Sequence, residues 1–172
     1  VASSLALASR CIALRYRPQY VRRRWVKEGR RKPQQRTEMD PMEYTCLGNT
    51  DLKVSRLGMG GLPFGSSIDA DEGQRVLDMF LDRGGNLVDT ANIYGGGMRG
   101  THEADAGRSE ATIGMMIKGR RDRVVLATKG YWSMHEDARG TDRAGLSRNY
   151  LTTNLDASLK RLGTDYVDLY QC

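Results

Sequence analysis

Three side chains that could move a proton follow two β-prone stretches of this sequence. Asp89 and Tyr94 lie on and just after the stretch 86–91, and Lys129 lies near the end of the stretch 123–130. Because the carboxyl ends of parallel strands meet at one edge of a sheet, where active sites are built, we expect these side chains to converge. A lysine ammonium beside a phenol stabilises the phenolate, so the tyrosine can pass its proton to a developing alkoxide, while an aspartate holds the lysine charge in place. The three residues predict a proton-donating site, although taken singly Asp89 also fits a helix cap and Lys129 a solvated surface chain.

To position these residues, strands and helices must alternate, and the sequence from Met42 onward predicts that they do. Turn residues at 47–50 between two β-prone flanks predict a hairpin. Apolar residues at helical spacing predict helices, and short apolar runs predict strands. After the hairpin we expect strands at 57–61, 86–91, 123–130 and 164–172, with helices at 69–85, 109–119 and 146–163 between them. This alternation predicts a parallel sheet with crossover helices, either a doubly wound open sheet or a (β/α)8 barrel.

Capping residues mark the ends of the predicted helices. Asp69 or Asp71 can cap the start of the first helix, which the glycines at 84–85 end. Ser147 is the predicted N-cap of the last helix and Gly163 its C-cap. The apolar stripe of this helix is predicted to consist of Leu151, Leu155, Leu159 and Leu162.

A glycine-rich stretch offers a competing interpretation as a dinucleotide-binding loop. Residues 95–100, GGGMRG, match the spacing G-x-G-x-x-G. That motif binds a pyrophosphate only when it joins a strand directly to the start of a helix, and here the strand ends near Ala91 and the helix begins near Ser109. We therefore interpret the stretch as a loop. Two histidines, His102 and His135, lack the spacing of metal ligands, so we expect no metal site.

Five motifs resemble, in order and spacing, those of the aldo-keto reductases: LGNTDLKVSRLGMGG, NLVDTANIYG, GRSEATIG, VVLATKG and SLKRLGTDYVDLYQ. The resemblance covers nearly all of residues 42–172 and is greatest to the branch that includes bacterial reductases and potassium-channel β-subunit-like proteins. It implies a (β/α)8 TIM barrel, an α/β fold of which this chain would hold the N-terminal hairpin and about the first four βα units. It also implies reduction of a small aldehyde or ketone to an alcohol with NADPH, with NADH as the alternative.

The resemblance also assigns roles to individual residues. It implies that Tyr94 is the general acid, that Lys129 assists it, and that Asp89 is the partner of the lysine and borders the cofactor. Gly60, Gly61 and Leu62, at the end of the first barrel strand, would border the nicotinamide ribose and the substrate. Tyr131 and Trp132 would line the apolar substrate pocket, with loop packing as the alternative. Ser109 and Glu110, which open the second helix, are interpreted as capping residues.

The chain departs from the family pattern in two places. The stretch between Tyr94 and Gly107 is longer than the short loop of the family, which could shape substrate access or be a tolerated insertion. The fourth catalytic residue of the family is a histidine directly after a segment like DLYQC, so it would be the residue after Cys172. The strands that carry the cofactor-phosphate loops would also come later. We therefore expect the chain alone to be an inactive N-terminal fragment, with no residue assignable to the cofactor 2′-phosphate.

Positive charge is concentrated at the start of the chain. Residues 1–41 hold 11 of the 27 Lys and Arg but 3 of the 21 Asp and Glu, a net charge of +8, which leaves −2 for residues 42–172. No nucleic-acid partner is expected for residues 42–172. The sequence contains no run of 18 apolar residues, so we expect no membrane span. Three cysteines without close spacing suit a reducing compartment, and we expect a cytoplasmic protein.

Residues 1–41 are expected to form a basic extension, disordered or targeting, that precedes a partial barrel over 42–172. An Arg-rich, acid-poor composition fits a mitochondrial or plastid transit peptide better than a secretory signal. A basic arm for RNA or anionic lipid is another interpretation.

A non-catalytic function is the alternative for the body. Four strands of an eight-stranded barrel leave open edges, which could pair with another chain. The sequence therefore also allows a half-barrel that acts as an interaction or regulatory module, of oligomeric state unknown.

Overall fold

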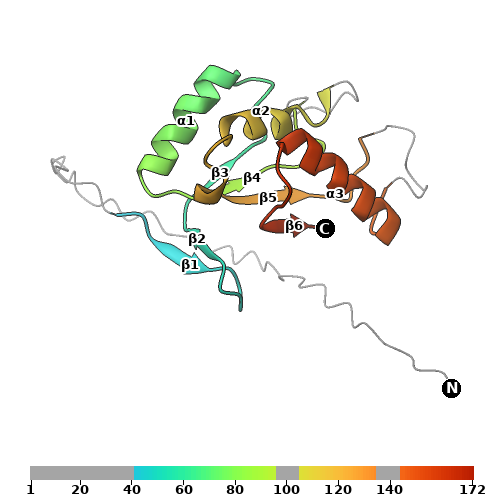
Figure 1. The fold of residues 1–172 in the computed structure, drawn as a ribbon, viewed down its shortest axis with the longest axis horizontal. Helices are drawn as coiled ribbons and strands as arrows, with labels where there is room; N and C mark the ends of the chain where they lie inside the picture. Colours follow the sequence, from blue (N-terminus) through green and yellow to red (C-terminus); the bar gives the residue numbers. More distant parts are fainter. Residues whose placement is uncertain (1–40, 96–104, 135–143) are drawn as a thin grey trace, which may run out of the picture. The chain divides into compact units, whose positions relative to one another are not determined.

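The computed structural model describes residues 41–95, 105–134 and 144–172, all within one compact unit that spans Met39–Cys172. A parallel sheet of four strands forms its centre (Figure 1), in the order β3-β4-β5-β6. The register places Met59 beside Val88, Val88 beside Leu126, and Thr128 beside Tyr170. The strands are β3 (Gly58–Gly60), β4 (Leu87–Asp89), β5 (Val125–Lys129) and β6 (Leu169–Gln171).

An antiparallel hairpin precedes the sheet, as the turn residues predicted. It consists of β1 (Tyr44–Cys46) and β2 (Lys53–Ser55), and Gly48 takes the positive φ of +58° that its turn requires. Ser55 and Asn86 join the hairpin to the residue before β4, because the Ser55 N–H donates to Asn86 Oδ1 at 2.7 Å and the Asn86 N–H donates to Ser55 Oγ at 3.0 Å. The hairpin is therefore attached at the amino ends of the strands, opposite the edge where Asp89 and Lys129 were expected.

Three helices follow strands of the sheet and lie on one of its faces (Figure 1). Their inward side chains and those of the strands form one hydrophobic core, because neither a helix stripe nor a sheet face is stable in water by itself. The helices are α1 (Ala70–Asp82), α2 (Arg108–Met116) and α3 (Arg148–Leu162), with a short 3-10 turn, η2 (Arg121–Arg123), before β5. The core consists of Met59, Phe64, Leu77, Leu81, Val88, Ile113, Met116, Ile117, Val124, Leu126 and Leu162.

The predicted caps of the first and third helices are confirmed. The Asp69 carboxylate accepts the Glu72 N–H at 2.8 Å, and the Ser147 hydroxyl accepts the Tyr150 N–H at 3.2 Å. Gly163 ends α3 in the left-handed region, at φ +63°. Both helices therefore start within two residues of their predicted positions, and α3 ends within one residue of its predicted end, whereas α1 ends three residues before the predicted 85.

The predicted leucine stripe of α3 is wrong in detail. Leu162 is buried, but Leu151, Leu155 and Leu159 are half-buried. The residues that α3 buries are Tyr150, Asn154, Ser158 and Leu162. This face is largely polar. Its Tyr150 and Asn154 side chains make hydrogen bonds to each other, to β6 and to the loop after β5.

The closing strand is shorter than predicted. Of the expected 164–172, Leu169–Gln171 alone form a strand. The Arg121 side chain contacts the segment before this strand. Its Nη2 donates to the Tyr166 carbonyl at 3.1 Å and to Asp168 Oδ2 at 2.7 Å. The Asp168 N–H already donates to the Leu126 carbonyl at 2.9 Å, so the chain is hydrogen-bonded to β5 one residue before β6 begins.

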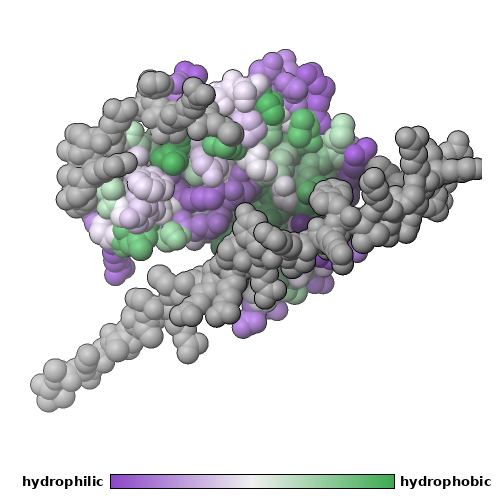
Figure 2. All heavy atoms as spheres, turned by 180° about the vertical axis from the view of Figure 1, so that it is seen from behind, coloured by the Kyte–Doolittle hydropathy of each residue, from purple (hydrophilic) through white to green (hydrophobic). Residues whose placement is uncertain are grey.

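In the view of Figure 2, hydrophobic and hydrophilic side chains are interspersed over the described residues that are visible. Exposed apolar side chains of this kind are ordinary on a protein surface when they are scattered. No helix in the described part of the chain is long and apolar enough to cross a membrane.

Candidate active site

Asp89 and Lys129 meet at the carboxyl edge of the sheet, where the sequence predicted them. Asp89 is the last residue of β4 and Lys129 the last of β5. Lys129 Nζ donates to Asp89 Oδ2 at 2.6 Å and to the Thr90 carbonyl at 2.9 Å. The ammonium is thus held by a carboxylate and a backbone oxygen, which use two of its three N–H donors among the described residues.

Tyr94 joins this pair through its ring. Lys129 Nζ lies 4.7 Å from the centroid of the Tyr94 ring, within the range of a cation–π contact. The Tyr94 carbonyl accepts the N–H groups of Gly107 at 3.1 Å and Ser109 at 3.2 Å, which fixes the loop after β4 to the start of α2. The structure therefore brings the three predicted residues together.

Gln171 is a fourth polar residue at this edge, and the sequence reasoning missed it. It ends β6, pairs in register with Lys129, and its Nε2 donates to Asp89 Oδ1 at 2.8 Å. Each oxygen of the Asp89 carboxylate therefore has its own donor, which restrains the rotation of the carboxylate. The available signal was positional, because Gln171 and Lys129 both end strands that the alternation predicts to be neighbours.

A cavity of about 660 Å³ opens beside Lys129. Its walls come from the loop after β4, the loop after β5, and the end of β6. Tyr131 and Trp132 contribute to the wall, with ring centroids 5.2 Å apart and planes at 83°, an edge-to-face pair. Both rings remain accessible, at 45% and 57% exposed respectively, so the predicted substrate-lining pair lies where a ligand could contact it.

The predicted cofactor-bordering residues lie at the end of β3, next to β4. Gly60 pairs in register with Asp89, and no atom lies within 4 Å of the place where a Cβ on Gly60 would be. Gly61 is different, because its N–H donates to the Asp89 carbonyl at 2.6 Å and a Cβ there would approach that oxygen to 2.8 Å. Leu62 is half-buried. A planar group could approach the backbone at Gly60, whereas Gly61 is required for packing.

The interpretation of Ser109 and Glu110 as capping residues is wrong. The N-cap of α2 is Gly107, at φ +84°, and no side chain caps this helix. Both side chains are buried and point inward: Ser109 Oγ donates to the Gly61 carbonyl at 2.7 Å, and Glu110 accepts from Thr128 Oγ1 at 2.6 Å and Arg161 Nε at 2.7 Å. The bonds of Glu110 hold α2 against β5 and α3, and its partner Thr128 directly precedes Lys129.

Several sequence features fall outside the described residues. These are the basic extension, residues 96–100 of the glycine-rich stretch, His102 and His135. Among the described residues, no group of three or more His, Cys, Asp or Glu side chains is placed to hold a metal ion.

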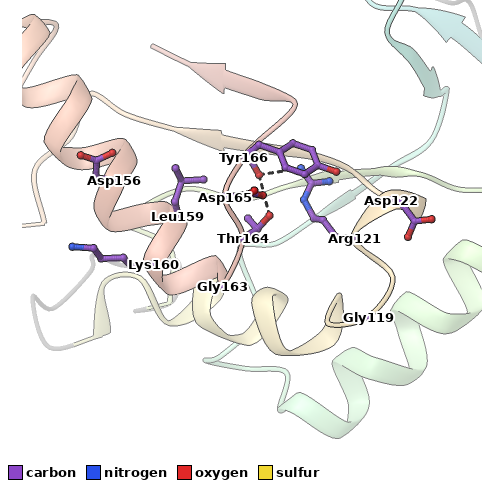
Figure 3. A pocket seen from close by; sticks show the side chains of 10 residues that line it. All are labelled: Gly119, Arg121, Asp122, Asp156, Leu159, Lys160, Gly163, Thr164, Asp165 and Tyr166. Atoms are coloured by element: carbon purple, nitrogen blue, oxygen red, sulfur yellow. Dashed lines mark hydrogen bonds between the residues drawn. The ribbon is translucent and has the colours of Figure 1, made fainter.

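A second hollow lies at the opposite, amino edge of the sheet, with a volume of about 970 Å³. Figure 3 shows Tyr166 above Arg121 at this hollow, with Lys160 on α3 directed away from them. The Arg121 guanidinium carbon lies 3.9 Å from the centroid of the Tyr166 ring. This edge therefore carries its own basic residue, carboxylate and tyrosine, namely Arg121, Asp168 and Tyr166.

Proteins of known family have sequences similar to that of this chain. The model of the aldo/keto reductase family matches residues 56–172. The uncharacterized oxidoreductase YrpG of Bacillus subtilis (strain 168) is 44% identical over 134 residues, which covers 76% of this chain and 39% of that protein. A probable voltage-gated potassium channel subunit beta of Arabidopsis thaliana is 36% identical over 135 residues, 76% of this chain and 37% of the relative. The chain thus spans about two fifths of the length of these relatives.

Solved structures agree with the sequence comparison. The aldo-keto reductase AKR11C1 from Bacillus halodurans (holo form) matches with a TM-score of 0.58 at 34% identity, covering 76% of this chain and 39% of that one. The hairpin and the four parallel strands are therefore the N-terminal part of a (β/α)8 barrel. The family consists of oxidoreductases that act on carbonyl substrates with NAD(P)H. With its family motifs, barrel strands and strand-end residues in agreement, this chain belongs to the aldo/keto reductase family.

Proposed function

We propose that this chain carries the proton-donating part of an active site that reduces aldehydes or ketones to alcohols with NADPH, NADH being the alternative cofactor. The observation that carries the proposal is the position of the Lys129 ammonium, held by Asp89 and the Thr90 carbonyl and placed 4.7 Å from the Tyr94 ring centroid. A fixed positive charge beside a phenol favours the transfer of the phenolic proton to an oxygen that becomes negative.

The residues at the strand ends fit a nicotinamide ring. Backbone at Gly60 is open where a Cβ would otherwise project, and Gly60 lies beside Asp89 in the register of β3 and β4. When bound there, the cofactor would supply the hydride to the carbonyl carbon. Tyr94 would donate the proton to the carbonyl oxygen, Lys129 would stabilise the resulting phenolate, and Asp89 would hold Lys129 in place.

The substrate opening is aromatic in character. Tyr131 and Trp132 present partly exposed rings to the cavity beside Lys129. Aromatic rings bury large apolar area and pair with other rings edge to face. We therefore propose that they contact the carbon skeleton of the carbonyl substrate.

Oxidation of NADPH with 4-nitrobenzaldehyde as substrate, followed by the loss of nicotinamide absorbance, tests the proposal. The assay uses a complete (β/α)8 barrel that contains this chain, because the chain spans only about two fifths of the length of its relatives. We expect the wild-type rate to fall by a factor of about 10²–10⁴ in Tyr94→Phe, the usual contribution of a general acid. A rate that Tyr94→Phe leaves unchanged would contradict the role of Tyr94.

A second candidate is a non-catalytic interaction module. In the described part of the chain β3 pairs with β4 alone, and β6 pairs with β5 alone, so each has an unpaired edge that another strand could occupy. A stable dimer of this chain by light scattering, together with no NADPH oxidation with any aldehyde by a complete (β/α)8 barrel that contains it, would favour this function over reduction.

A further inference from the structure

Two side chains from separate elements donate hydrogen bonds to one backbone oxygen in the loop after β5. Asn92 Nδ2 donates to the Trp132 carbonyl at 2.8 Å, and the Tyr150 hydroxyl donates to the same oxygen at 2.7 Å. Asn92 is 1% exposed and Tyr150 9%. A carbonyl oxygen has two lone pairs, so these donors use its full capacity. Neither residue has a role in the proposed proton transfer.

Tyr150 ends a longer, partly buried chain of hydrogen bonds. The Tyr170 hydroxyl lies 3.1 Å from Asn154 Oδ1, the nearer of its two acceptors, and 3.4 Å from the Leu151 carbonyl. Asn154 Nδ2 in turn donates to the Tyr150 hydroxyl at 3.1 Å. Every bond in this chain points the same way, from β6 through α3 to the Trp132 carbonyl. Hydrogen bonds that point the same way polarise and strengthen one another in a low-dielectric interior.

Burial favours the protonated, donating form of both phenols. It raises the pKa of the Tyr170 phenol to about 12, and it also raises the pKa of the Tyr150 phenol. Both hydroxyls therefore keep their protons to a higher pH than an exposed tyrosine does. Gly130 makes room for Tyr170, because a Cβ at this position would lie 1.9 Å from the Tyr170 hydroxyl oxygen.

The clamped carbonyl links the two loops that form the site. Asn92 lies between Asp89 and Tyr94 in the sequence, so its amide ties the Tyr94 loop to the aromatic loop of Tyr131 and Trp132. The aromatic rings themselves are half exposed and cannot fix their own positions by burial. Their backbone is fixed instead, by the two bonds to the Trp132 carbonyl and by the Gly145 N–H, which donates to the Tyr131 carbonyl at 2.8 Å.

We propose that Asn92 and Tyr150 are positioning residues that set the distance between the aromatic rings and Tyr94, and that this clamp favours aryl aldehydes over small aliphatic aldehydes. The substrate part of the proposal rests on the function proposed above. An aryl group needs a wall at a fixed distance to stack on, whereas a short aliphatic aldehyde makes little contact with either ring. The clamp therefore acts on binding of the aryl substrate and leaves proton transfer by Tyr94 in place.

The clamp itself is tested by hydrogen exchange of the Gly145 N–H, which bonds across the neck of the aromatic loop. The variants are Asn92→Leu and the milder Tyr150→Phe, which keeps the ring and removes only the hydroxyl. Loss of one such bond should speed exchange of this amide about fivefold in either variant. Tyr44→Phe is the matched control, because the Tyr44 hydroxyl also donates to a backbone carbonyl, that of Gly84, but in the hairpin.

Fluorescence of Trp132 gives a second readout, in a Trp25→Phe background that leaves Trp132 as the single tryptophan. The anisotropy of its emission should fall in both clamp variants and stay unchanged in Tyr44→Phe. Asn92 and Tyr150 donate to the same oxygen. The change in anisotropy in the double variant should therefore differ from the sum of the changes in the two single variants. Exchange within a factor of about two of the wild type, together with unchanged anisotropy, in correctly folded Tyr150→Phe would overturn the clamp.

Substrate preference then tests the second half of the proposal. With 4-nitrobenzaldehyde we expect KM to rise about fivefold in both clamp variants with kcat little changed, and with propanal we expect neither constant to move. Equal changes for both aldehydes would overturn the specificity role. These assays use a complete (β/α)8 barrel that contains this chain. Loosening of Trp132 in such a barrel that reduces no aldehyde would contradict the proposed reduction and leave the clamp standing, so the two failures are distinguishable.

Discussion

The two edges of the sheet carry the same three kinds of residue and use them differently. At the carboxyl edge Lys129 pairs with Asp89 and lies over the ring of Tyr94, and at the amino edge Arg121 pairs with Asp168 under the ring of Tyr166. The Lys129 and Asp89 side chains are 31% and 35% exposed, whereas those of Arg121 and Asp168 are 15% and 21% exposed. A list of residue types alone would not separate the two sets.

The two sets differ in the partners to which their charged side chains are hydrogen-bonded. Arg121 donates to the carbonyls of Val124 and Tyr166, and Asp168 also accepts the Leu126 N–H at 2.8 Å, so this pair joins the starts of β5 and β6. Among the described residues Lys129 has a single backbone partner, and its ammonium lies over the Tyr94 ring beside an open cavity. A basic residue that is committed to main-chain oxygens stabilises the fold, whereas one beside a phenol and an open cavity is available for chemistry.

The largest effect should come from removing the two tyrosine hydroxyls one at a time. Tyr94→Phe should lower the aldehyde-dependent oxidation of NADPH about 10²–10⁴-fold, because it removes the proposed proton donor. Tyr166→Phe should leave this rate unchanged, because Tyr166 lies at the other edge. Equal losses in the two variants would show that the comparison between the edges does not describe catalysis.

Stability should respond in the reverse order. Arg121→Met leaves Asp168 without its cation in a largely buried position and removes two bonds to carbonyls, so we expect the free energy of unfolding to fall by about 2–3 kcal/mol. Lys129→Met breaks a more exposed pair and should cost less than about 1 kcal/mol. Urea unfolding followed by circular dichroism measures both, and a larger loss for Lys129→Met would reverse the assignment of the structural pair.

Gln171 allows a finer test of how the carboxyl edge is held. In Gln171→Leu the Asp89 carboxylate loses the donor on Oδ1, so it restrains Lys129 less and an amine-modifying reagent should label Lys129 about threefold faster. Gln74→Leu is the control, because Gln74 Nε2 makes the same kind of bond to Asp78 Oδ1, at 2.9 Å, on α1. Mass spectrometry of the labelled peptide gives the rate. Identical labelling of Lys129 in both variants would mean that Gln171 does not restrain the ion pair.

The sequence predicted the parts of this fold that depend on local chemistry. The hairpin, the alternation of strands and helices, and the caps at Asp69, Ser147 and Gly163 follow from residues close together in the chain. The meeting of Asp89 with Lys129 also follows, because parallel strands align their carboxyl ends.

What the sequence did not predict depends on contacts between distant residues. Glu110 resembles a capping residue, and only the packing of α2 shows that it bonds to Thr128 and Arg161 instead. Asn92 and Gln171 were missed because their partners, the Trp132 carbonyl and Asp89, lie 40 and 82 residues away in the chain. Local pattern carries no information on which backbone oxygen or carboxylate a polar side chain will reach in the fold.

The comparison can be sharpened further through a dependence of stability on alkaline pH, which belongs to the carboxyl edge and its half-buried Tyr170 phenol. Burial raises the pKa of Tyr170 to about 12, from 10.0 in an unfolded chain. Between these values the folded protein keeps a proton that the unfolded chain has lost, so the free energy of unfolding falls as the pH rises from 10 toward 12, and this contribution is fully present below pH 10. In Tyr170→Phe that part of the slope should disappear, which urea midpoints measured across this range would show. An equally steep slope in Tyr170→Phe would place the titrating group elsewhere.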